Sequence, residues 1–144
     1  MEKAIYIGND TAGFYLKSKC IEYLEGKGIP YVDCGSADDP DIEATRYPFF
    51  AAKVAKAVAS GEARYGLLIC GTGIGMSIAA NKVRGIRCAL LSDVECAKMT
   101  RLHNDTNMMA LGAGVVGENL ALEIADIWLG TEFSGDERHQ RRIN

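Results

Sequence analysis

A cysteine and a threonine stand in a glycine-rich turn with the sequence Cys70-Gly71-Thr72-Gly73-Ile74-Gly75. A thiol can take up or release a proton, and a hydroxyl can hydrogen-bond a reacting group. The apolar run before the turn, residues 67–69, predicts a buried strand, and a helical pattern follows the turn. Backbone N–H groups converge at such a turn, and the helix dipole adds positive potential. The stretch therefore predicts an anion site beside an acid–base group.

The spacing of Gly71, Gly73 and Gly75 matches neither the Walker phosphate loop nor the dinucleotide-binding fingerprint. A second interpretation is therefore a tight turn whose small residues let strand and helix pack closely. In that case Cys70 is a small buried hydrophobic residue. The turn by itself leaves both interpretations open.

The composition of the 144-residue chain is that of a single globular domain. We find no long apolar span and no signal-peptide pattern, so we expect a cytoplasmic protein without a membrane partner. The net charge of −3 argues against non-specific nucleic-acid binding. Five cysteines without a CxxC pair argue against a disulfide framework and a zinc site, and two histidines argue against a histidine-rich metal site. We expect no metal and no cofactor.

Strand and helix patterns alternate along the whole chain, which predicts a parallel sheet with helices on both faces. We expect an α/β, Rossmann-like three-layer αβα sandwich with a five-stranded sheet of order 2-1-3-4-5. The domain covers residues 1–144, and 131–144 form a C-terminal tail. The predicted strands are Ala4–Gly8, Ile29–Cys34, Leu67–Cys70, Arg87–Leu91 and Asn107–Leu111. The predicted helices include Ala12–Lys27, Tyr47–Ser60, a segment from Asp93 to His103, and Glu118–Leu129, with a loop at Gly35–Arg46.

The predicted strand order reverses between the first and third strands, and ligands of such sheets bind at the reversal. The loop after the first strand, Asn9–Gly13, should therefore lie beside Cys70. Asp10 and Cys70 then face one cleft, which favours the catalytic interpretation of the glycine turn. Asp10 can also serve as the N-cap of the first helix, and the two roles are compatible.

Two further segments carry polar groups that could act on a ligand. Arg101–Asp105 ends a predicted helix, where His103 can be only a partner of the helix dipole and Asn104 a helix-ending residue. Arg138 and Arg142 are four residues apart and share a face if the tail is helical. Two guanidinium groups side by side suit a phosphate, whereas the alternative is a solvated tail.

Several motifs, in this order, together resemble the ribose-5-phosphate isomerase B family, which also includes the paired subunits of galactose-6-phosphate isomerase. They are Asp10-Thr-Ala-Gly, Tyr47-Pro48, Cys70-Gly-Thr-Gly-Ile-Gly, Ser77-Ile-Ala-Ala-Asn-Lys, Gly85-Ile-Arg, His103-Asn-Asp and Arg138-His-Gln-Arg-Arg142. The resemblance implies an aldose–ketose isomerase acting on a sugar phosphate, in the first place ribose 5-phosphate. It also implies a metal-free homodimer or dimer of dimers with the site at the subunit interface, where the tail packs.

The resemblance also implies a role for each matched residue. His103 opens the furanose ring, Asp10 and Thr72 assist, and Cys70 moves the proton between C1 and C2 through a cis-enediolate. The amides from Gly71 to Ser77 hold the oxyanion, and Tyr47 lines the pocket. Asn104 binds sugar hydroxyls, and the two tail arginines bind the phosphate. The substrate-binding set implied in this way is Thr11, Tyr47, Gly71, Gly73, Gly75, Met76, Ser77, Asn104, Arg138 and Arg142.

Two departures from the family pattern concern the phosphate. Thr11 stands where the family usually has histidine, and Gly114 where it usually has arginine. Each lost charge-assisted hydrogen bond costs roughly 1.5–3 kcal/mol of binding. Arg46 is a candidate replacement charge, although an exposed loop arginine is the simpler interpretation. Galactose or allose 6-phosphate and a tetrose 4-phosphate therefore stay open as substrates, as does a non-catalytic phosphosugar-binding module.

Overall fold

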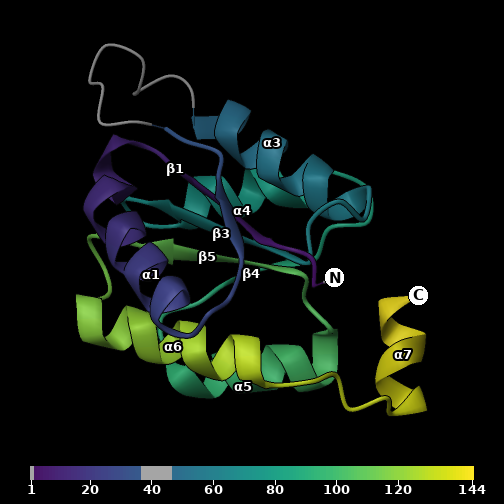
Figure 1. Ribbon diagram of the computed structural model, residues 1–144. Helices are drawn as coiled ribbons and strands as arrows, with labels where there is room; N and C mark the ends of the chain where they lie inside the picture. Colours follow the sequence, from purple (N-terminus) through teal and green to yellow (C-terminus); the bar gives the residue numbers. More distant parts are fainter. Residues whose placement is uncertain (1, 37–46) are drawn as a thin grey trace.

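The computed structural model describes residues 2–36 and 47–144, which form a parallel five-stranded sheet between two layers of helices (Figure 1). This confirms the predicted α/β sandwich. The strands are β1 (Ile5–Asn9), β2 (Tyr31–Asp33), β3 (Tyr65–Cys70), β4 (Cys88–Leu90) and β5 (Met108–Gly112). The helices are the 3₁₀ turn η1 (Thr11–Gly13), α1 (Phe14–Gly26), α3 (Tyr47–Ala59), α4 (Ile74–Asn81), α5 (Val94–Asn104), α6 (Glu118–Gly130) and α7 (Glu137–Ile143). The predicted loop 35–46 lies, beyond Ser36, outside the described residues.

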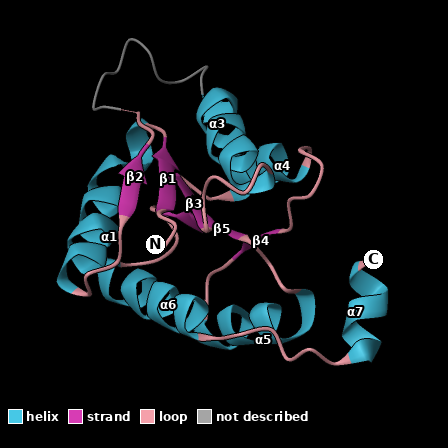
Figure 2. Ribbon diagram, turned by 45° about the vertical axis from the view of Figure 1, so that its right-hand side comes forward, coloured by secondary structure: helices cyan, strands magenta, loops and turns pink. Residues whose placement is uncertain are grey.

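Each face of the sheet carries its own apolar core. Helices α1, α5 and α6 cover one face, and α3 and α4 cover the other (Figure 2). The first core centres on Trp128 of α6 with Ile7 and Leu67, all essentially inaccessible to solvent. The second centres on Met76 of α4 with Val54. The period-2 pattern fails in β3 and β5 because strands covered on both faces are apolar throughout.

The strand order is β2-β1-β3-β5-β4, so the predicted order 2-1-3-4-5 is wrong for its last two strands. Strand β5 pairs with β3 and is buried at every residue, whereas β4 has three residues and lies at the edge with Leu90 exposed. An interior strand of a parallel sheet is covered on both faces, so the fully apolar strand takes that position. The reversal beside β1 is unaffected, because β1 still pairs with both β2 and β3.

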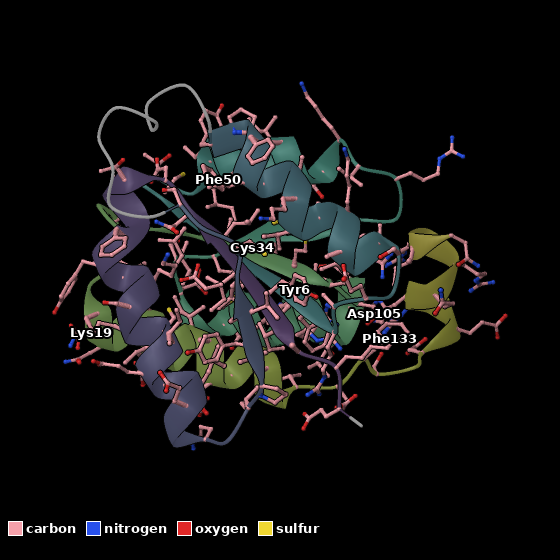
Figure 3. The ribbon with its side chains drawn as sticks, turned by 45° about the horizontal axis from the view of Figure 1, so that its top comes forward. Tyr6, Lys19, Cys34, Phe50, Asp105 and Phe133 are labelled. Atoms are coloured by element: carbon pink, nitrogen blue, oxygen red, sulfur yellow. The ribbon has the colours of Figure 1, made fainter. Side chains whose placement is uncertain are left out.

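Helix α7 stands beside the sandwich, at the end of the chain (Figure 2). The segment before it returns along α5, where the Ser134 N–H donates to the carbonyl of Leu102 at 3.4 Å. Asp105 and Phe133 mark this junction in Figure 3. His139 is the one residue of α7 that is buried. The part of the tail that carries Arg138 and Arg142 is helical, as is required if the two arginines are to share a face.

Among the described residues, no helix combines the length and apolar character that a membrane span requires.

Candidate functional site

Cys70 lies in a pocket of about 280 Å³ at the carboxyl ends of β1 and β3, which we call the Cys70 pocket. The loop after β1 and the glycine turn after β3 meet there, as expected for ligand sites of open parallel sheets. Its lining is Asp10, Tyr47, Cys70, Gly71, Thr72 and Gly75.

The glycine turn keeps some of its N–H groups free and uses others internally. The Gly73 N–H donates to the Sγ of Cys70 at 3.1 Å, and the Ile74 N–H donates to Oγ1 of Thr72 at 3.2 Å. The Ser77 N–H donates to the Gly73 carbonyl at 3.0 Å. Within the described part of the chain, four N–H groups of the turn and first helical residues donate no hydrogen bond. These belong to Gly71, Thr72, Gly75 and Met76.

The expectation that all amides from Gly71 to Ser77 are available to an oxyanion is therefore too broad. The amide of Ser77 is inside the helix hydrogen-bond pattern, and its hydroxyl donates to the Ile74 carbonyl at 2.8 Å. The Met76 side chain is fully buried in the core, so only its backbone faces the turn. The Gly73 amide is directed at the Cys70 sulfur, and is therefore not available to a ligand.

Close packing at two glycines holds the pocket in shape. A Cβ on Gly75 would lie 2.7 Å from Cε1 of Tyr47, so glycine lets the tyrosine ring lie against the start of α4. A Cβ on Gly112 would lie 2.5 Å from the carbonyl oxygen of Thr72. The end of β5 thus supports the turn backbone directly, and its next two N–H groups continue this support by donating to the carbonyls of Cys70 and Gly71.

Asp10 performs the structural role that the sequence left open beside the catalytic one. Its Oδ1 accepts the N–H of Gly13 at 3.0 Å, which caps η1. Its own N–H donates to the Ile69 carbonyl at 3.1 Å, tying the loop to β3. Asp10 also lines the Cys70 pocket, so its capping role leaves it at the pocket wall. Thr11 follows in η1 and is half-buried.

The other four cysteines lie in surroundings that oppose ionisation. Burial raises the pKa of Cys20 to about 12 and that of Cys88 to about 12. Burial also raises the pKa of Cys34, and hydrogen bonding to Asp93 raises that of Cys96. Cys70 alone among the five accepts a backbone N–H from a glycine turn. Its place in the glycine turn thus sets the thiol of Cys70 apart from the other four.

His103 lies elsewhere, in a second pocket of about 340 Å³ at the end of α5, which we call the His103 pocket. The ring of His103 stacks on His139 of α7, with ring centroids 4.2 Å apart and planes 24° apart. Burial lowers the pKa of His139, and the charges of His103, Arg138 and Arg142 lower it further. The pocket is lined by Arg87, His103, Asn104, His139, Arg142 and Ile143.

A buried arginine fixes the end of α5 that presents His103. Arg101 is 2% exposed and donates to the carbonyls of Thr131 and Thr106 and to Oδ1 of Asp105, at 2.9, 2.6 and 2.9 Å. Asp105 ends the helix in the left-handed region, with φ of 44°. Arg87 donates to the Asp105 carbonyl at 2.7 Å from the other side.

The two tail arginines differ in their surroundings. Arg142 lines the His103 pocket. Arg138 is exposed and pairs with Asp136 at 3.5 Å, while its Nη2 lies 3.4 Å from Nε2 of His139. Gly114 is exposed, and its N–H donates to the Gly71 carbonyl at 2.9 Å, so this position adjoins the glycine turn rather than the tail. Arg46 lies outside the described residues.

The structure thus divides the predicted site residues between two pockets of one chain. Neither pocket contains both Cys70 and His103. Arg87 and His139 had no predicted role, although both occur in the quoted motifs. Among the described residues, no group of three or more His, Cys, Asp or Glu side chains is placed to hold a metal ion.

Fold and site together define a doubly wound α/β protein with a thiol and a glycine-rich turn at its topological switch point. A family model described as "Ribose/Galactose Isomerase" matches residues 5–144. The chain belongs to this family, and is therefore a sugar-phosphate isomerase of the aldose–ketose type.

Individual relatives agree with the family match. The chain is 47% identical to ribose-5-phosphate isomerase B of Escherichia coli over 141 residues, 98% of this chain and 92% of that protein. It is 44% identical to D-erythrulose-4-phosphate isomerase of Pectobacterium atrosepticum over 132 residues, 92% of this chain and 86% of that protein. The structure of Clostridium thermocellum ribose-5-phosphate isomerase B matches with a TM-score of 0.92 at 47% identity, covering 97% and 92% of the two chains.

Proposed function

We propose that the enzyme interconverts ribose 5-phosphate and ribulose 5-phosphate, with Cys70 as the proton-transfer group. The observation that carries this proposal is the Cys70 Sγ, which accepts the Gly73 N–H at 3.1 Å and opens into a pocket lined by Asp10 and Thr72. The names of the Escherichia coli and Clostridium thermocellum relatives support the pentose as substrate.

The reaction follows from the arrangement of thiol and amides. The Cys70 thiolate removes the proton from C2 of the open-chain aldose, and the electron pair moves into a C1–C2 double bond while the C1 oxygen becomes the oxyanion. The resulting thiol returns the proton to C1, and the O2 hydroxyl proton moves to O1, which leaves the ketone at C2. The free N–H groups of Gly71 and Thr72 stabilise the cis-enediolate as preorganised donors. His103 opens the furanose ring before this step.

We infer that a second copy of the chain completes the site, since Cys70 and His103 occupy different pockets of one chain. The face beside the glycine turn suits such a partner. Ile74 and Ile78 lie one turn apart on α4 and are 50% and 55% exposed, and Leu90 of the edge strand is 44% exposed. A Cβ on Gly73 would lie 2.6 Å from Cδ1 of Leu90, so this apolar face adjoins the turn.

The homodimer, with the tail 131–144 at its interface, brings the His103 pocket of one subunit to the Cys70 pocket of the other. Association of two such dimers stays an open extension of this proposal. Hydrophobic faces of this kind are typical of permanent dimer interfaces.

Cys70→Ala tests the chemistry. The variant should fold normally and lose both aldose–ketose conversion and exchange of the C2 proton with deuterated solvent. Cys96→Ala, which changes an exposed cysteine, serves as the matched control and should keep its activity. Full activity of Cys70→Ala would refute the assignment, whereas binding without any deuterium exchange in the unmodified protein would favour a non-catalytic phosphosugar-binding module.

Hybrid dimers test the shared site. Cys70→Ala and His103→Gln proteins are each inactive or weak alone, and are mixed after mild dissociation. If each site takes Cys70 from one subunit and His103 from the other, random mixing restores about a quarter of the normal activity, because half of the dimers carry one intact site of two. A mixture no more active than its components would place both residues in one subunit's site.

A tetrose 4-phosphate is the second substrate candidate, and the Pectobacterium relative favours it. Gly114 brings no cationic side chain to the turn, so a phosphate would have fewer contacts there than with the arginine usual in the family. The specificity constants for ribose 5-phosphate, erythrose 4-phosphate, and galactose and allose 6-phosphates, measured as ketose formation, decide between them. The pentose proposal fails if another aldose phosphate is turned over at least ten times faster.

A further inference from the structure

His139 of α7 contacts the residue to which ring opening is assigned. Its imidazole stacks on that of His103, with centroids 4.2 Å apart, and it is only 8% exposed. Aromatic rings in this arrangement stabilise each other beyond the effect of the area that they bury. His139 is also the one residue of α7 that is buried, so its ring is the main anchor of that helix.

The same stack connects α7 to the remaining parts of the His103 pocket. Arg142 follows His139 by three residues, on the same side of the helix, and lines the pocket with it. The segment leading into α7 is tied to α5 at Thr131, whose carbonyl accepts from Arg101 at 2.9 Å, and at Ser134, whose N–H donates to the Leu102 carbonyl at 3.4 Å. Beyond Ser134, the buried ring of His139 is the main anchor of α7. The position of Arg142 therefore depends on where the His139 ring sits on His103.

We propose that His139 is a positioning residue: by stacking on His103 it docks helix α7, orients the His103 ring, and places Arg142 at the same pocket. This inference rests on the proposed function for the role of His103, whereas the docking itself does not depend on any activity. Without the stack, the His103 imidazole would be free to move. Misplacement of a catalytic group by about 1 Å is enough to lower the reaction rate roughly a hundredfold.

The charged groups around His139 favour its neutral ring. Arg138 and Arg142 of α7 oppose a proton on His139, as does a charge on His103 of α5, while Asp136 before α7 favours it. Arg87, from the segment before β4, adds a further cation to the pocket. Cationic side chains from α7 and from the segment before β4 therefore surround the stack.

Three variants separate stacking from other roles. His139→Phe keeps an aromatic ring without a titrating group, His139→Ala removes the ring, and Gln140→Ala changes an exposed neighbour on the same helix as a control. We expect kcat/KM to fall at least tenfold in His139→Ala, with KM also raised, and to stay within about threefold of normal in His139→Phe and Gln140→Ala. Equal losses in the Phe and Ala variants, or no loss in the Ala variant, would overturn the proposal.

Two measurements do not depend on catalysis. Hydrogen exchange of the α7 amides should accelerate in His139→Ala and stay slow in His139→Phe. Because the chain has two histidines, NMR also follows each imidazole separately. In His103→Gln the pKa of His139 should rise, since the charge that opposes its protonation is gone. Unchanged hydrogen exchange of α7 in His139→Ala, or an unchanged pKa of His139 in His103→Gln, would refute the stack in solution. Both results are readable even if no tested sugar phosphate is turned over.

Discussion

Replacement of Gly112 by alanine tests whether the end of β5 holds the glycine turn in place. The new Cβ would lie 2.5 Å from the carbonyl oxygen of Thr72 and 2.6 Å from its carbonyl carbon. These distances are about 1 Å shorter than favourable contact between heavy atoms. Both groups belong to the backbone, so no side chain can rotate away and the turn itself has to move. Gly112 has no positive φ, so the clash acts without added backbone strain.

The expected cost follows from this geometry. Overpacking of a well-packed interior typically lowers the free energy of unfolding by about 1–3 kcal/mol. We expect a value at the upper end, because the new Cβ meets backbone atoms that cannot rotate away. For a domain of this size each kcal/mol lowers the Tm by about 3–5 °C, so a cost of about 2–3 kcal/mol corresponds to a decrease of roughly 6–15 °C. A displacement of the turn by about 1 Å should also lower kcat/KM by up to a hundredfold.

Gly130→Ala is the matched control, because a Cβ on Gly130 at the end of α6 meets nothing within 4 Å. Thermal unfolding followed by circular dichroism and initial rates of ketose formation are measured for both variants. Gly130→Ala should match the unmodified protein or exceed its stability slightly. If Gly112→Ala unfolded at the same temperature and reacted at the same rate as this control, support of the turn by β5 would be refuted.

Three further predictions concern the framework around the two pockets. Arg101→Met should lower the free energy of unfolding by about 2–4 kcal/mol, because the carbonyls of Thr106 and Thr131 lose their donor. Urea unfolding measures this free energy, with Arg141→Met, which changes an exposed arginine, as the control. Equal stability of the two variants would contradict the prediction. Trp128→Phe should cost about 1–2 kcal/mol, since the Nε1–H donates to Oγ1 of Thr106 at 3.0 Å; an unchanged urea midpoint would show that this bond is dispensable. The N–H of Cys96 lowers the pKa of Asp93, so its stabilising charge is fully present above the unfolded-state pKa near 3.9 and is lost as the pH falls through the lower folded-state pKa. Asp93→Asn keeps the capping group without its charge. The Tm of this variant should therefore fall less steeply below about pH 4 than that of the unmodified protein, and an equally steep fall would contradict the prediction.

Much of the fold could be predicted from local chemistry. Alternating strand and helix patterns lead to a parallel sheet because each strand-to-helix unit can return to the sheet in only one way. The anion-binding turn was visible as glycines after an apolar strand, and Asp10 was visible as a cap. The order of the last two strands could not be predicted in this way. Which strands become neighbours depends on burial across the whole sheet, and a single segment carries no information about that.

The candidate site shows the same boundary between sequence and tertiary structure. The sequence by itself determined the reactive groups: a thiol at the start of a glycine turn, a histidine at a helix end, and two arginines one helical turn apart. Only the tertiary structure decided which of these groups meet. It separates Cys70 from His103 into two pockets, places His139 against His103, and assigns the Gly73 amide to the thiol. Some of these contacts join residues that are distant in the chain, and others depend on the direction of a single N–H. Both kinds of contact are set by how the helical layers pack around the sheet.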